Sequence, residues 1–143
     1  MTPGQELLHA VGPYSARLTE QLLHGDEQGA LHTCLACGAT VGADGLFVLV
    51  YALAARAAAP VRGRGPITLQ LLDSAGRPVA PEEVAVEPTH RGALAAWRSV
   101  VAAVTFDADM VEAFYVALHQ DVDEAKTGYL TALIGLASRA PGR

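Results

Sequence analysis

The stretch 45–59, GLFVLVYALAARAAA, decides the fold of this chain. A helix formed by these residues is apolar nearly all round, so it has no natural solvent face. We therefore expect it at the centre of the fold. Asp44 is well placed to cap the start of this helix, and Pro60 is expected to end it.

The residues before this helix predict further helices. Thr2 followed by Pro3 is a helix-start signal, and the short helix that follows is expected to break at Gly12 and Pro13. Helical spacing then resumes until HGDEQG, which is a turn signal. Asp26, within that turn, is expected to cap the next helix, which carries both cysteines of the chain.

The period of the pattern changes after VRGRGP. In 67–79, ITLQLLDSAGRPV, apolar residues first alternate with polar ones, and DSAG is a turn sequence. This combination predicts a β-hairpin over 67–79, and Val84 and Val86 suggest a further short strand. Helical spacing returns after Thr89, with Asp107 as an N-cap within it and the acidic run DVDE before the last helix.

These patterns together predict a mainly α fold. We expect a compact helical domain of about six helices with a small central β-hairpin near 67–79. A chain of 143 residues is long enough to bury a hydrophobic core of its own. Since each half of the chain would be marginal alone, residues 1–143 are expected to form a single domain.

Composition limits the classes of partner. The net charge of −5 argues against nucleic acid, which requires a concentrated basic face. Hydrophobic residues make up 51% of the chain and charged residues only 17%, so burial is expected both in a tight core and against a partner, which is a second copy in a homodimer or another protein. No signal peptide is readable and the apolar run 46–55 is too short to span a bilayer, which predicts a cytoplasmic protein. The bias toward arginine, alanine and glycine is typical of GC-rich bacterial genes.

Cys34 and Cys37, the two cysteines of the chain, are the candidate for chemistry. A C-x-x-C pair becomes redox-active when its first thiol lies at a helix N-terminus, where the helix dipole stabilises the thiolate. If Thr33 caps the helix, Cys34 is placed in that way. If Asp26 caps it, both cysteines lie within the helix on an apolar face and behave as small hydrophobic residues. Helix length favours Asp26 and inert cysteines.

The helical C-x-x-C pair resembles that of the alkylhydroperoxidase D-like family, compact all-helical proteins whose activity uses such a pair. That family also has a histidine shortly after the second cysteine, whereas CGATVGADG has none and His32 precedes the pair. A zinc site would require two further ligands, and no second C-x-x-C and no H-x-x-x-H accompany these cysteines. We therefore expect no metal and no cofactor.

Two other groups of polar residues are candidates for binding. Acidic residues and a histidine are concentrated in FDADMVE and HQDVDE; they are Asp107, Asp109, Glu112, His119, Asp121, Asp123 and Glu124. Helix capping and solvent-exposed helix faces explain these residues better than a divalent-metal site does. Arg62 and Arg64 could hold an anion, although VRGRGP is not a phosphate-binding loop and a solvated linker is the simpler interpretation.

Four aromatic residues recur at helical spacing, namely Trp97, Phe114, Tyr115 and Tyr129. We expect them in the core or at an interface, although a pocket between helices could use the same side chains. Because no complete catalytic motif is present, the sequence favours a binding or interaction module over an enzyme. Two alternatives remain. One is a thiol-redox protein using Cys34 as nucleophile and Cys37 as resolving thiol, and the other is a helical pocket for an apolar small molecule.

Overall fold

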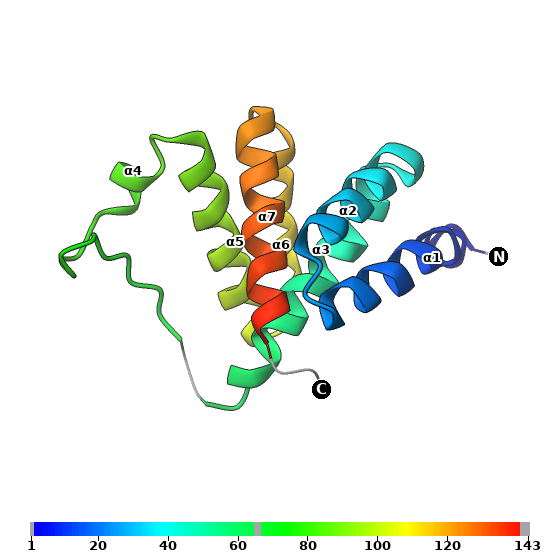
Figure 1. Cartoon of the computed structure of the whole chain (residues 1–143), viewed down its shortest axis with the longest axis horizontal. Helices are drawn as coiled ribbons and strands as arrows, with labels where there is room; N and C mark the ends of the chain where they lie inside the picture. The colour runs from blue at the N-terminus through cyan, green and yellow to red at the C-terminus, as the bar shows by residue number, and fades with distance from the viewer. Residues whose placement is uncertain (1, 65–66, 141–143) are drawn as a thin grey trace.

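The computed structural model describes residues 2–64 and 67–140, so the last two residues of VRGRGP lie outside it. This part of the chain forms seven α-helices and one 3-10 helix, arranged as in Figure 1. Their bounds are α1 Pro3–Leu23, α2 Glu27–Val41, α3 Ala43–Ala58, η1 Ala59–Val61, α4 Pro81–Val84, α5 Pro88–Val104, α6 Ala108–His119 and α7 Asp123–Arg139. The prediction of a mainly α fold is confirmed.

Helix α3 lies at the centre, as the sequence predicts. It packs against α1, α2, α5, α6 and α7, and Leu49, Val50 and Leu53 on it are almost completely buried. The helix begins two residues earlier than expected, with Gly42 rather than Asp44 as the N-cap. Gly42 has a φ of 101°, a conformation that glycine adopts without steric cost. Asp44 lies instead in the first turn, where the helix dipole favours a carboxylate.

The stretch Ala43–Val61 has 19 residues and a mean hydropathy of 1.5, so by length and composition alone it could cross a membrane. The central helix of a folded core has the same properties. Helix α3 makes contacts with five other helices, and 33% of this apolar window is buried within the fold.

Helix α1 corrects the expected break at Gly12 and Pro13, because it runs without interruption and contains Pro13. Proline lacks an N–H group and so leaves the carbonyl of His9 without its helical partner. His9 and Pro13 are both exposed, so water can donate a hydrogen bond to the His9 carbonyl. Val11 and Leu18, on either side of the proline, are buried against the neighbouring helices, and this packing outweighs the local signal.

The predicted β-hairpin over 67–79 is wrong. The chain does reverse at DSAG, where the Asp73 carboxylate accepts the backbone N–H groups of Ala75 and Arg77, both at 2.9 Å. However, Leu72 and Pro78 form only an isolated bridge, and the described residues contain no strand. The turn extends to one side of the helices (Figure 1), and within the described residues no third strand pairs with the segment. An isolated two-stranded hairpin is marginal without such support.

The expected short strand at Val84 and Val86 is also wrong, because Pro81–Val84 forms the short helix α4. Its sequence is suited to this, since proline occupies the first turn and Glu82 and Glu83 follow it at the positive end of the helix. The β-branched valines did not outweigh these local helix signals.

Helices α5 and α7 form the closest helix pair of the fold. A Cβ atom built on Gly92 would overlap the carbonyl oxygen of Ala125, and one on Gly128 would lie 2.9 Å from that of Thr89. Only glycine permits backbones to approach so closely. Farther along the pair, Ser99 Oγ and Tyr129 Oη lie 2.9 Å apart in the core, and Ser99 also donates to the carbonyl of Ala95. The two helices therefore form a fixed framework.

Candidate functional site

The helix that carries the cysteines starts at Glu27, and the Asp26 carboxylate accepts the Gly29 N–H at 2.9 Å. The prediction that Asp26 caps this helix is confirmed. Thr33, the alternative cap, instead donates from Oγ1 to Gln21 Oε1 at 2.7 Å and ties α2 to α1. Cys34 therefore lies well inside the helix, away from the N–H groups of the first turn that would stabilise a thiolate.

Cys34 and Cys37 are free thiols whose side chains are completely buried. Burial raises the pKa of Cys34 to about 12, and the nearby Cys37 contributes in the same direction. Burial raises the pKa of Cys37 as well. His32 is exposed and so lies apart from the pair. At neutral pH both sulfur atoms are therefore protonated and shielded from solvent.

The acidic residues serve as caps and ion-pair partners. Asp107 caps α6 by accepting the Met110 N–H at 3.1 Å, as the sequence predicts. Asp121 accepts two hydrogen bonds of 2.6 and 2.7 Å from Arg91, an ion pair that no local sequence pattern predicts. Those hydrogen bonds from Arg91 lower the pKa of Asp121 to about 2. Across 2–64 and 67–140, no cluster of three or more histidine, cysteine or acidic side chains could hold a metal ion.

The guanidinium of Arg62 is engaged within the fold, whereas the sequence favoured a solvated linker over an anion ligand. Its Nε and Nη2 atoms donate to the carbonyl oxygen of Ala103 at 3.2 and 2.8 Å. The same guanidinium lies over the ring of Phe106. Arg62 thereby covers the negative C-terminal end of α5, while Arg64 is exposed. The structure does not bring these two arginines together around a common site.

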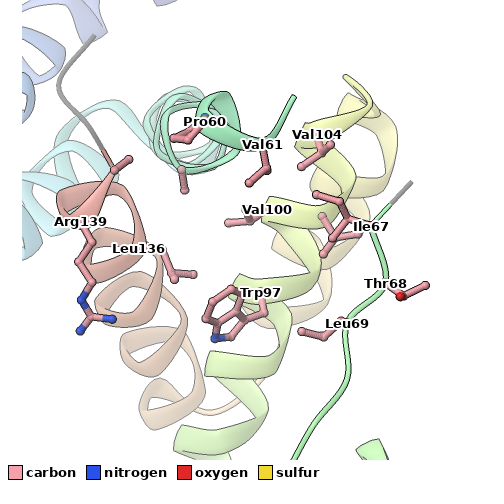
Figure 2. Close-up of a pocket in the computed structure, with 13 residues that line it drawn as sticks. Pro60, Val61, Ile67, Thr68, Leu69, Trp97, Val100, Val104, Leu136 and Arg139 are labelled. Carbon is pink, nitrogen blue, oxygen red and sulfur yellow. The ribbon is translucent and has the colours of Figure 1, made fainter. Parts of the chain in front are cut away.

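The most site-like feature is an apolar cavity of about 390 Å³ between α5, α7, η1 and the connection that follows η1. We call it the Trp97 groove. Figure 2 shows Trp97 and Val100 from α5 facing Leu136 from α7, with Ile67 and Leu69 on the opposite flank. Its lining residues are Ala57, Pro60, Val61, Ile67, Thr68, Leu69, Trp97, Val100, Val101, Val104, Leu136, Arg139 and Ala140.

A second cavity of about 400 Å³ adjoins the Trp97 groove. The two cavities share four lining residues, Ile67, Leu69, Val101 and Val104. The connection that carries the first two of these crosses α5 and separates the cavities. The second cavity continues to Met110 and Phe114 on α6, and Arg98 and Asp107 form its polar side.

The structure separates the four aromatic residues that the sequence singled out. Trp97 and Phe114 line the two adjoining cavities, and Trp97 remains 44% exposed. Tyr115 and Tyr129 are buried, with Tyr115 donating its hydroxyl to the carbonyl of Ala43 at 2.7 Å. Sequence reasoning missed Leu136 and Arg139 as groove residues. Ile67 and Leu69 do give a signal, the alternation in ITLQL, but this alternation is typical of a strand and does not indicate a groove.

Comparison of the chain with protein-family models, with curated proteins and with solved structures gives no match. The function is therefore argued from the geometry of the Trp97 groove.

Proposed function

We propose that this protein is a binding protein that takes an apolar small molecule in the Trp97 groove. The observation that carries the proposal is the half-exposed indole of Trp97 beside an apolar cavity of about 390 Å³. Small-molecule sites are concave, mostly apolar and about 300–1,000 Å³ in volume. A ligand that covered the indole and the aliphatic side chains around it would gain about 25 cal/mol for each Å² of apolar surface removed from water.

The walls of the groove differ in how firmly they are held. Trp97 lies on α5 and Leu136 lies on α7. The close contacts at the glycines and the buried Ser99–Tyr129 hydrogen bond hold these two helices together. The opposite flank, with Ile67 and Leu69, belongs to a connection without regular structure. The wall formed by α5 and α7 is thus a preformed surface for a ligand.

The proposal is tested with N-phenyl-1-naphthylamine, an uncharged apolar probe whose absorption overlaps tryptophan emission. Trp97 is the only tryptophan in the chain, so all tryptophan emission comes from the indole beside this groove. We expect saturable binding of one probe molecule, with quenching of Trp97 emission as the emission of the probe rises. Probe binding that does not saturate, or that leaves Trp97 emission unchanged, would contradict the proposal.

The matched variants are Ile67→Asp and Leu72→Asp. Both substitutions lie in the same connection, but Ile67 lines the groove whereas Leu72 is 57% exposed and does not. A carboxylate in the apolar cavity should weaken probe binding by about tenfold or more. Leu72→Asp should leave it unchanged, and equal effects of the two variants would place the probe outside the groove.

Self-association is a second proposal with its own support. Several large apolar side chains outside the groove are strongly exposed, among them Leu8, Leu23, Leu72 and Val86. Contact with a second copy would remove such surface from water, in agreement with the low fraction of charged residues. Sedimentation velocity over a hundredfold range of concentration tests this, and a single monomeric species throughout would exclude the homodimer. The cytoplasmic location and the bacterial origin remain predictions.

A further inference from the structure

We propose that the ligand of the Trp97 groove is an anionic amphiphile, with its apolar chain in the groove and its carboxylate bound by Arg139. This inference rests on the proposed function and specifies the class of ligand. Arg139 is the only charged residue among the described residues that line the cavity. A purely apolar ligand would make no use of this charge at the rim.

The polar groups at the rim are hydrogen-bond donors without partners. Neither the Arg139 guanidinium nor the Trp97 indole N–H donates a hydrogen bond within the part of the chain that the structure describes. In Figure 2 the Arg139 guanidinium lies at α7 and the Trp97 indole nitrogen lies at α5, with Leu136 between them. Guanidinium and indole groups donate hydrogen bonds and accept none. Their match in a ligand is therefore an acceptor, and a carboxylate suits a guanidinium best.

Arg139 differs in this respect from the neighbouring arginines. Arg56 donates to the carbonyl of Ala137 at 3.4 Å, and Arg62 donates to that of Ala103. These two side chains are thus engaged with carbonyl groups near the ends of α7 and α5, where the helix dipoles are negative. Arg139 lies in the last turn of α7 and is exposed; the Glu27 carboxylate lies near its guanidinium beside Gly135, but the described residues form no ion pair between them.

The charge distribution supports the same class of ligand. The chain carries a net charge of −5, and yet no carboxylate is found among the described residues that line the Trp97 groove. An anion would be repelled by most of the surface but would meet a positive charge at this rim. The preference for an anion should weaken as salt is added, because an exposed guanidinium is screened.

The experiment compares decanoate with decanol, which share an alkyl chain and differ in the charge of the head group. Binding of each to the full chain is measured by Trp97 fluorescence at low ionic strength. We expect decanoate to bind about fivefold more tightly than decanol, as suits a charge-assisted contact at an exposed site. Equal affinity for the two compounds would overturn the assignment of the head group.

The variant Arg139→Gln tests whether Arg139 supplies the positive charge that binds the carboxylate, and Arg64→Gln is the matched control. Both residues are exposed arginines near this end of the fold, and Arg64 does not line the groove. We expect Arg139→Gln to abolish the preference for decanoate while decanol binds as before, and Arg64→Gln to retain the preference. Loss of the preference in both variants, or in neither, would overturn the inference.

The two proposals fail in different ways. If the uncharged probe binds but decanoate has no advantage over decanol, the groove is a binding site whose ligand is not anionic, and only this inference is wrong. If neither the probe nor either amphiphile affects Trp97 emission, the proposed function itself is wrong.

Discussion

The guanidinium of Arg62 lies over the ring of Phe106, with its carbon 3.9 Å from the ring centre. Phe106 lies in the turn between α5 and α6 and has a φ of 60°, which is in the left-handed region. This conformation costs a bulky residue about 1–2 kcal/mol. Because Arg62 also binds the carbonyl of Ala103, one side chain closes the end of α5 and covers the strained turn.

Replacing Arg62 by alanine should therefore destabilise the fold. The variant loses two charge-assisted hydrogen bonds and the contact with Phe106, and we expect the free energy of unfolding to fall by about 1–2 kcal/mol. Urea unfolding followed by circular dichroism measures the change. Arg64→Ala is the control and should shift the free energy by less than about 0.5 kcal/mol, since Arg64 is exposed. Equal shifts in the two variants would show that the contacts of Arg62 contribute nothing.

The sequence predicts those parts of the fold that depend on local signals. Asp26 and Asp107 act as N-caps at the positions expected, and Thr2 forms a capping box with Gln5 at the start of α1. Each of these residues satisfies N–H groups within the next turn, so its effect is contained in a few neighbouring residues. The central position of α3 was predictable because its apolar surface extends around the whole helix.

The features that depend on distant residues were not predicted. Pro13 continues a helix because packing elsewhere supports it, and the alternating residues 67–71 pack beside α5 without a neighbouring strand to pair with them. The Trp97 groove combines three segments that are far apart in the sequence, which no periodicity within one segment reveals. Trp97 was expected in the core or at an interface, and only the arrangement of α5, α7 and the connection shows it beside a cavity.

Removing the Ser99 hydroxyl should lower the free energy of unfolding more than removing the Tyr129 hydroxyl does. Ser99→Ala leaves the Tyr129 hydroxyl buried without a partner, and we expect a loss of about 1–3 kcal/mol. Tyr129→Phe should cost only about 1 kcal/mol, because the Ser99 hydroxyl keeps its bond to the carbonyl of Ala95. Urea unfolding of both variants and of the double variant measures these terms. Costs that add fully in the double variant would show that the two hydroxyls do not interact.

The cysteines should be inert in the folded protein. Because burial raises the pKa of Cys34 to about 12, the thiol carries almost no thiolate at neutral pH and is also inaccessible. The fully reduced native protein should not react with iodoacetamide at pH 7.5, whereas both cysteines should react in urea. Ala36→Cys is the control, because residue 36 is exposed on the same helix and a thiol there should be labelled quickly. Labelling of Cys34 at a comparable rate in the native protein would favour the redox alternative.

The ion pair between Asp121 and Arg91 should make stability depend on pH in acid. The hydrogen bonds from Arg91 lower the pKa of Asp121 from 3.8 to about 2, so the unfolded chain binds this proton at a higher pH than the folded protein does. The resulting stabilisation is complete above the unfolded value and is lost as the pH falls through 3.8 toward about 2. Asp121→Asn should reduce this part of the pH dependence, measured as the urea midpoint at several pH values. Asp123→Asn is the control, because the side chain of Asp123 is 99% exposed. An unchanged pH dependence in Asp121→Asn would mean that the ion pair does not stabilise the fold.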